Sequence, residues 1–565
     1  MNLFETLANG NIKLIFITLS GILVNVAFVQ IPFQLRFSKN LRTHVLLSFI
    51  LTPLFLCVGF LCFKYLVIRI GIDTYLNNML LPGLVLGIIF VLYNLLTTAP
   101  ESRKTKKRIP KLKDTRFRFT LEVSNNKDIV FSDPYDGFLA TAGANSGKTK
   151  SLGRPLLREY IRHDFAGFIY DLKDFDYTRV ASWLLENQYK DYPYSFYYMN
   201  FVDPSRSYRC NLVKPALMGV NDLVQYLEDF AKAYKGKDAK EDEWFDGGLG
   251  ILKGVGVRFF FDYPEYCTMP HIAHFVIQNS SADVKNFVNQ RPESRALAKS
   301  FIDTHKTTPK AAGSYLSSIS GILGKFAFNK EVCYVLSGDD FDFNLIDPED
   351  PKLLCVSNSY GVKDILSPVI AMMIQMTARR FTLANKVDFT FFLDEATTFR
   401  VNNFEELPSL LREYKVSFTF ITQSLSKIEI QYDLQERRSL TSNLTNQFIG
   451  KTKDTYSQKE YVQKFPKDEV IKKSRGRSSS SKGGTTSSVN TREDKDYRYD
   501  TDFFEYLGPG EFVGTASNAN YFDFHLQFNQ LKIDEDYQVP VVREVTSEIL
   551  DKNFNNIVKQ VQELI

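Results

Sequence analysis

The chain has 565 residues, of which 44% are hydrophobic, and it carries a formal net charge of +4. This length exceeds what a membrane anchor or one compact domain requires, so a body with two lobes is expected. The excess positive charge lies in the first 100 residues, and basic and acidic residues balance over the remainder. A bulk electrostatic attraction for nucleic acid is therefore excluded, and any nucleic-acid contact must use a local basic surface.

The cysteines lack the paired spacing of a zinc site or a disulfide scaffold. Two lie within an apolar stretch and the others are scattered singly: Cys57, Cys62, Cys210, Cys267, Cys333 and Cys355. This usage is typical of a reduced, cytoplasmic compartment.

Three apolar stretches near the N-terminus each have about the 20 residues that a helix needs to cross a bilayer. They cover residues 14–33, 44–68 and 79–96. A signal peptide would need a positively charged N-terminal region and a cleavage site with small residues. Only one basic residue, Lys13, precedes the first stretch and no such site follows it, so we interpret the stretch as a span. Residues 1–100 are thus expected to form a three-span membrane anchor.

Loop charges predict the orientation of this anchor. The first loop is basic, and the third span is followed by a basic collar made of Arg103, Lys104, Lys106, Lys107, Arg108, Lys111 and Lys113. The positive-inside rule then puts the N-terminus outside and the collar, part of a juxtamembrane linker over 101–135, in the cytoplasm. The basic residues of the collar are explained by their role in fixing the membrane topology and by contact with anionic lipids. The alternative is that they guide DNA.

A phosphate-binding loop follows the linker. Residues 137–149 read GFLATAGANSGKT, and a helical stretch over 152–160 comes next. Small residues let backbone N–H groups cradle phosphate oxygens at a helix N-terminus, with Lys148 on the β- and γ-phosphates and Thr149 on Mg²⁺. ATP is expected to contact Ala142, Gly143, Ala144, Asn145, Ser146, Gly147, Lys148 and Thr149. Ala142 stands where a glycine is usual.

A second motif supports the first. The apolar run 389–393 ends in Asp394-Glu395. Such a run predicts a strand buried on both faces of a parallel sheet, with carboxylates at the edge where open α/β sheets bind ligands. We expect Asp394 to hold Mg²⁺ and Glu395 to act as the base that polarises the attacking water. A pair that merely opens a turn is the alternative.

Further strands complete a doubly wound, mainly parallel sheet. They are expected at 165–170, 195–201, 353–356, 416–421, 447–450 and 512–515. Gln423 follows the strand 416–421 and is placed to sense the γ-phosphate. The alternative is that it is only a polar residue at the end of a strand. The fold class expected is α/β, a RecA-like P-loop NTPase with an inserted all-α lobe and N-terminal transmembrane helices.

The insertion interrupts the nucleotide-binding domain. Residues 136–215 form its first part, 216–343 an all-α domain, and 344–539 its second part. Aromatic residues of the insertion are interpreted as core rather than as DNA-stacking platforms. The polar, Gly/Ser-rich segment 474–494 is expected to be a mobile loop, and 540–565 a C-terminal tail.

These motifs resemble the type IV secretion coupling proteins, the TraG/TraD-like ATPases of conjugation. Asp171-Leu172-Lys173-Asp174 is similar to the family's Asp-x-Lys-Gly element, and Asn211-Leu212 to its Asn-Pro-Leu element. Residues 412–424 are similar to its arginine–strand–Gln-Ser element. This chain departs from the pattern at Ala142, at Asp174 and at Leu212-Val213.

The resemblance implies a multi-pass, homohexameric motor of the cell inner membrane, with its body in the cytoplasm. It implies that ATP hydrolysis with Mg²⁺ passes a relaxase bound to single-stranded DNA to a type IV secretion channel. Arg412 matches the family's arginine and is our candidate for a charge supplied to the neighbouring subunit's nucleotide, expected near the ligand edge. Its rivals are Arg379, Arg380 and Arg400.

Two other functions fit the same motifs. One is an FtsK-like translocase of double-stranded DNA, although the segment 540–565 is too short for the winged helix such proteins usually carry. The other is a coupling protein whose main cargo is protein effectors.

Overall fold

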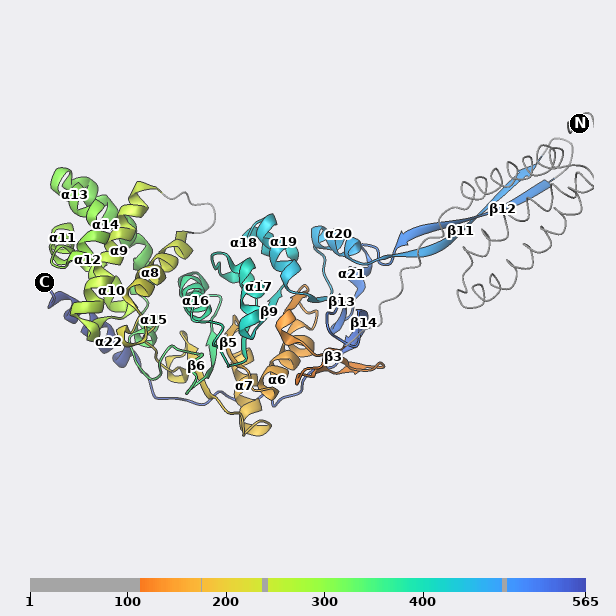
Figure 1. Cartoon of the computed structure of the whole chain (residues 1–565), viewed down its shortest axis with the longest axis horizontal. Helices are drawn as coiled ribbons and strands as arrows, with labels where there is room; N and C mark the ends of the chain where they lie inside the picture. The colour runs from red at the N-terminus through yellow and green to blue at the C-terminus, as the bar shows by residue number, and fades with distance from the viewer. Residues whose placement is uncertain (1–111, 174, 236–241, 480–484) are drawn as a thin grey trace, which may run out of the picture. The chain divides into compact units, whose positions relative to one another are not determined.

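The computed structural model describes residues 112–173, 175–235, 242–479 and 485–565 (Figure 1). The three expected spans and the collar up to Lys111 lie outside these ranges. None of the helices within them is long and apolar enough to cross a membrane. Residues 109–565 form one compact unit.

A ten-stranded sheet organises the described part of the chain, in the order β2-β14-β13-β10-β4-β9-β8-β5-β7-β6. Every pair from β10 to β6 is parallel, whereas β13, β14 and β2 extend the sheet with antiparallel pairs. The strands are β2 (Val123–Ser124), β4 (Phe138–Thr141), β5 (Ala166–Asp171), β6 (Ser195–Asn200), β7 (Lys352–Ser357), β8 (Phe389–Leu393), β9 (Val416–Thr422), β10 (Asn446–Ile449), β13 (Glu511–Thr515) and β14 (Asp523–Phe528). The expected α/β class with a mainly parallel sheet is confirmed.

Each face of the sheet carries its own hydrophobic core, because successive side chains of a strand point to opposite faces. On β8, Phe391 belongs to one core and Phe392 to the other. Helices α6 (Arg154–Arg162) and α7 (Asp176–Asn187) cover the Phe392 face, and α16 (Lys363–Ala378) covers the Phe391 face. The apolar run read as a doubly buried strand is therefore buried on both sides.

The inserted segment is helical, as expected (Figure 1). Its helices are α8 (Val220–Lys235), α9 (Glu243–Asp262), α10 (Met269–Gln278), α11 (Ser281–Asn289), α12 (Pro292–Leu297), α13 (Lys299–Thr307), α14 (Pro309–Ala327) and α15 (Lys330–Leu336). Most of its aromatic side chains are core, including Tyr226, Phe230 and Phe326, but Trp244 remains 46% exposed. The core of this lobe is continuous with the core on the Phe391 face of the sheet.

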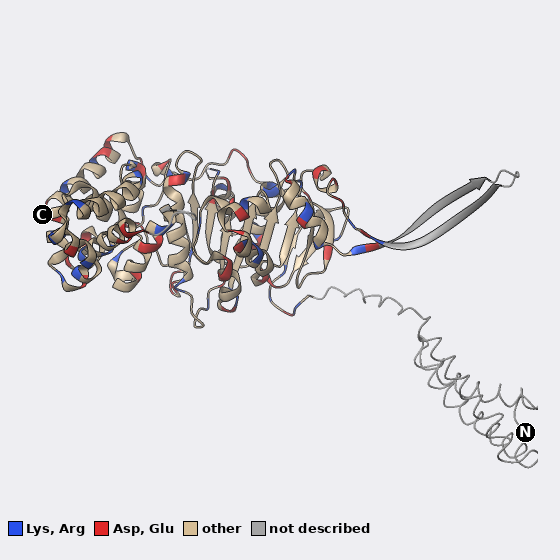
Figure 2. Cartoon of the chain, turned by 90° about the horizontal axis from the view of Figure 1, so that it is seen from above, with Lys and Arg blue, Asp and Glu red and all other residues tan. Residues whose placement is uncertain are grey.

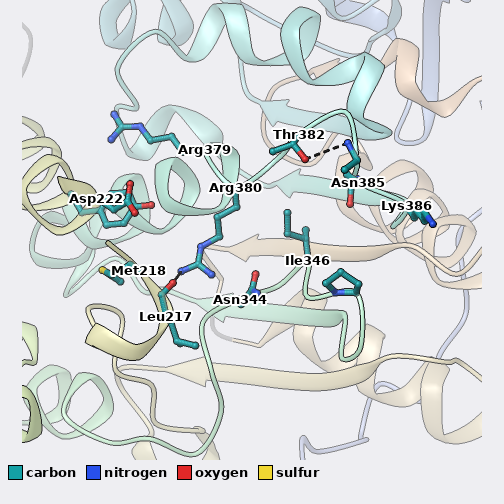
Figure 3. Close-up of a pocket in the computed structure, with 13 residues that line it drawn as sticks. Leu217, Met218, Asp222, Asn344, Ile346, Arg379, Arg380, Thr382, Asn385 and Lys386 are labelled. Atoms are coloured by element: carbon teal, nitrogen blue, oxygen red, sulfur yellow. Dashed lines mark hydrogen bonds between the residues drawn. The ribbon is translucent and has the colours of Figure 1, made fainter. Parts of the chain in front are cut away.

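A cavity of about 530 Å³ lies where the lobe meets the sheet (Figure 3). Arg380 points into it and donates to the carbonyl oxygen of Leu217 at 3.2 Å. Its neighbour Arg379 pairs instead with Asp229 at 2.8 Å, and Lys386 lines the rim. Asp222 also lines this cavity, and basic and acidic residues are interspersed along the described part of the chain (Figure 2).

The segment after β14 runs back along the domain and ends on the helical lobe. The backbone N–H of Leu531 donates to the carbonyl of Lys150, and that of Val542 donates to Ser205. Glu535 binds the nearly buried Arg154 at 2.7 Å, together with Lys150 and Arg179, and Arg154 is the main reason its pKa falls to about 2. Helix α22 (Ser547–Gln562) then packs on α10 and α15.

Most of the segment 474–494, expected to be a mobile loop, lies in two paired strands, and its mobility stays a prediction. Strands β11 (Lys467–Ser479) and β12 (Thr485–Tyr497) pair antiparallel, and residues 480–484 lie outside the described ranges. Antiparallel pairing satisfies backbone N–H and C=O groups without needing a hydrophobic core. A polar composition argues against packing, but it does not exclude a two-stranded ribbon.

Shorter elements connect these parts. They are β1 (Phe119–Leu121) paired with β3 (Ile129–Phe131), the short helices η2 (Pro134–Asp136), η4 (Pro204–Arg206), η5 (Pro215–Leu217), η6 (Pro264–Tyr266), η7 (Ala396–Thr398), η8 (Phe404–Glu406) and η9 (Leu411–Tyr414), and α17 (Leu407–Leu410), α18 (Leu425–Gln431), α19 (Leu434–Asn443), α20 (Thr455–Lys464) and α21 (Phe503–Tyr506).

Candidate nucleotide site

The loop interpreted as phosphate-binding joins β4 to a helical turn, η3 (Lys148–Gly153), that continues into α6. Gly147 has φ of 86°, and a side chain there would meet the backbone nitrogen of Gly510 at 2.5 Å. Only glycine fits this position. Ala142, which replaces the usual glycine, is fully buried and is not among the residues with positive φ, so the substitution leaves the loop backbone unstrained.

Lys148 is buried at the centre of the loop. Its Nζ donates to the carbonyl of Ala142 and, at 3.3 Å, to that of Gly143, and it lies 3.8 Å from Oε1 of Glu395. Burial lowers the pKa of this ammonium, while the carboxylates of Glu395 and Asp394 oppose the shift. The two motifs predicted separately from the sequence therefore meet in space.

Asp394 follows β8 and is 1% exposed. Its Oδ2 has no hydrogen-bond partner among the described residues. The pKa of this carboxyl is raised to about 7, mainly by burial and also by the nearby Glu395 and Asp171, while Lys173 and Lys148 oppose the rise. An unpartnered, buried carboxylate oxygen is suited to bind Mg²⁺. The hydroxyl of Thr149 and the phosphates of the nucleotide would supply further ligands to the ion.

Glu395 has φ of 45°, a left-handed conformation that is uncommon for a residue other than glycine. Its Oε1 accepts a hydrogen bond of 2.9 Å from Nε2 of Gln423, which follows β9. The backbone turn thus aims the Glu395 carboxylate at both Lys148 and Gln423. Three of the four residues expected to be catalytic are brought together.

The fourth, Arg412, is not part of this cluster. It lies in η9 before β9, pairs with Asp136 at 3.5 Å and donates to the carbonyl of Asn443 at 3.1 Å. Asp136 precedes β4, so this contact lies at the amino ends of the strands, opposite the loop that follows β4. The expectation that Arg412 lies near the ligand edge of its own subunit is wrong, because it precedes a strand rather than following one.

The rival arginines divide in the same way. Arg379 and Arg380 also precede a strand, β8. Arg400 follows β8, donates to the carbonyl of Gln431 and pairs with Glu436 at 2.8 Å. Arg400 lies in the segment that leaves the carboxyl end of β8, whereas the other three candidates lie in segments that lead into the amino end of a strand.

Asp171 and Lys173, noted in the sequence only as part of a family element, also belong to the site. Asp171 ends β5, is fully buried, and accepts from the backbone N–H groups of Lys173 at 3.0 Å and Tyr177 at 2.7 Å. Burial raises its pKa to about 6. The rule that located Asp394 at a strand's carboxyl end also applies to Asp171, and the charge of Lys173 reaches Asp394.

Comparison with known proteins places this arrangement in context. Residues 388–499 match a family model described as the TraM recognition site of TraD and TraG. No curated protein sequence matches the chain.

Three solved structures of one bacterial protein share the fold. The unbound conjugative coupling protein TrwBΔN70 has a TM-score of 0.55 and 15% identity, over 73% of this chain and 88% of that one. TrwB in complex with ADP and Mg²⁺ has a TM-score of 0.56 and 14% identity, over 73% and 89%. TrwB with a non-hydrolysable ATP analogue has a TM-score of 0.54 and 14% identity, over 73% and 89%. The expected resemblance to the TraG/TraD-like coupling proteins is confirmed.

The raised pKa of Asp394 predicts a pH-dependent stability. Its folded-state pKa of about 7 exceeds the ordinary value of about 4. The folded chain therefore holds a proton that the unfolded chain has lost, and the free energy of unfolding falls as pH rises from about 4 to 7. Asp394→Asn should raise the melting temperature at pH 8 by about 1 °C per kcal/mol recovered, because the entropy of unfolding grows with chain length.

The rise in melting temperature caused by Asp394→Asn should be smaller at pH 5 than at pH 8. Calorimetry without nucleotide or Mg²⁺ measures it. Asp246→Asn, at an exposed carboxylate on α9, is the matched control and should show no such pH dependence. An equal gain at both pH values would contradict the assigned protonation.

Proposed function

We propose that the chain is an ATPase that uses Mg²⁺. The observation that carries this proposal is the convergence of Lys148, Asp394, Glu395 and Gln423 beside the loop 142–149 at one edge of a parallel sheet. The loop amides and Lys148 would bind the phosphates, and Thr149 and Asp394 would hold the metal. Mg²⁺ supplies neutralisation of the phosphate charge when it is bound.

In this proposal Glu395 accepts a proton from the attacking water. Its carboxylate is 6% exposed, so few solvent molecules compete for it. Lys148 offsets the negative charge that grows on the transferring phosphoryl group. Gln423, already hydrogen-bonded to Glu395, reports the state of the phosphate to β9 and the helices that follow it.

We further propose that this hydrolysis couples a relaxase–single-stranded DNA substrate to a type IV secretion channel. Support comes from the TraD/TraG family match over 388–499 and from the shared fold with a protein described as a conjugative coupling protein. The inserted helical lobe would recognise the cargo. The motor would be a homohexamer held in the inner membrane by residues 1–100.

An FtsK-like translocase of double-stranded DNA is the weaker alternative. The shared fold with a protein described as a conjugative coupling protein gives more direct support to the coupling proposal. A coupling protein for protein effectors shares every feature of the site and is distinguished only by its cargo.

The chemistry predicts different defects for two substitutions. Glu395→Gln should retain ATP binding and lose about 10²–10⁴ in hydrolysis rate, because it removes a positioned base. Lys148→Ala should weaken binding itself. Steady-state ATPase rates and binding of a fluorescent ATP analogue separate the two effects. Hydrolysis by Glu395→Gln at the wild-type rate would sink the assignment.

The cargo predicts what stimulates the enzyme. The purified chain should bind single-stranded DNA weakly and lose that binding steeply as salt rises, because phosphate contacts release counterions. Single-stranded DNA should also raise the ATPase rate more than duplex DNA does. Stimulation by a protein substrate and by no nucleic acid, across a range of salt, would favour the effector-export alternative.

Assembly predicts complementation between subunits. If Arg412 acts in trans, Arg412→Ala and Lys148→Ala chains should each be inactive but recover part of the ATPase when co-assembled. Some interfaces then join an intact loop to an intact arginine. Arg400→Ala, mixed in the same way, is the matched comparison, because Arg400 follows a strand whereas Arg412 precedes one. Normal hydrolysis by assembled Arg412→Ala would exclude it as the trans-acting residue.

A further inference from the structure

The side-chain amide of Gln423 has a charged partner at each end. Its Nε2 donates to Oε1 of Glu395 at 2.9 Å, and its Oε1 accepts from Nζ of Lys427 at 2.6 Å. Glu395 Oε1 in turn lies 3.8 Å from Nζ of Lys148. A continuous line of polar contacts therefore leads from an exposed lysine to the buried centre of the nucleotide site.

The backbone at Lys427 is held firmly although its side chain is exposed. Ser424 caps α18 by accepting from the backbone N–H of Lys427 at 3.3 Å. Leu425 and Ile428 bury the inner side of this helix. Lys427 thus stands one helical turn beyond the end of β9, within reach of Gln423.

These two partners determine which way the amide faces. With Nε2 toward Glu395 and Oε1 toward Lys427, both contacts are attractive. Turned over, the amide would set its oxygen against a carboxylate and its N–H groups against an ammonium. In the observed orientation one N–H of Gln423 is used by Glu395, and the second stays available to a phosphate oxygen.

We infer that Lys427 is a positioning residue for the proposed ATPase, acting through the amide of Gln423 on Glu395. The inference rests on the proposed function of this site. It assigns a role to a surface lysine that neither motif contains. Because the hydrogen bond from Lys427 is exposed to solvent, its loss should count as that of an ordinary hydrogen bond, a fall in kcat of about three- to tenfold with KM for ATP unchanged.

A direct effect of charge is the competing explanation, since Lys427 also lowers the pKa of Lys148 slightly through space. A double-mutant cycle separates the two. Kinetics of the full-length chain in detergent would be measured for Lys427→Met, Gln423→Ala and the double variant. Lys427→Arg tests rescue, and Lys459→Met, at an exposed lysine on α20, is the matched control.

The expected result is that Lys427→Met lowers kcat in the wild-type background and has no further effect once Gln423 is Ala. Lys427→Arg should restore most of the rate, and Lys459→Met should leave it unchanged. An equal fall in both backgrounds, or no fall in either, would overturn the inference. The proposed ATPase would survive both of those results, because it depends on Lys148 and Glu395.

A structural measurement covers the case in which the wild-type chain hydrolyses no ATP. Electron cryomicroscopy of the full-length Lys427→Met variant should show Gln423 turned away from Glu395 or spread over rotamers. An unchanged Gln423 side chain would overturn the inference on its own.

Discussion

The contact between the Lys148 ammonium and the Glu395 carboxylate, both nearly excluded from water, is the interaction on which the whole carboxyl edge depends. A buried charge is tolerated only when other charges and hydrogen bonds compensate it. Lys148 is held by loop carbonyls and by Glu395, and Glu395 is held by Gln423. Asp394 lacks such compensation at Oδ2, and burial accordingly raises its pKa to about 7. The edge is therefore set up to gain stability from a cation.

The parallel sheet makes this clustering possible. Strands β4, β9, β8 and β5 are neighbours, and each delivers its following residues to the same edge. Lys148, Gln423, Glu395 and Asp171 thus come from four separate parts of the sequence and need no long loops to meet. On the Phe391 face, the core beneath them continues into the helical lobe. Helix α16 therefore packs in a core that the sheet and the lobe share.

Periodicity and motif spacing predicted most of this arrangement. The strand 389–393 and the helices of the lobe were predicted because their apolar patterns are long and unmixed. Strand β14 was not predicted, although its buried residues alternate with exposed His525 and Gln527 as in a half-buried strand and it pairs with the nearby β13. Its other neighbour, β2, is distant in sequence. The edge on which Arg412 lies could have been predicted from the sequence, because Arg412 precedes the strand expected at 416–421 and open α/β sheets bind ligands at the carboxyl ends of their strands. The β11–β12 ribbon was missed because composition reports on packing and not on backbone pairing.

The C-terminal segment has a mechanical consequence. The lobe is joined to the sheet by the chain entering α8, by the chain leaving α15, and by the return from β14 to α22. A body attached at one point can swing freely, and one attached at two points can still rotate about the line between them. Three attachments remove that axis, so the lobe can move only as its supports deform together. The return segment carries Glu535, bound to Arg154 on the helix that follows the phosphate loop. Glu535 thereby ties that helix to the segment that reaches the lobe.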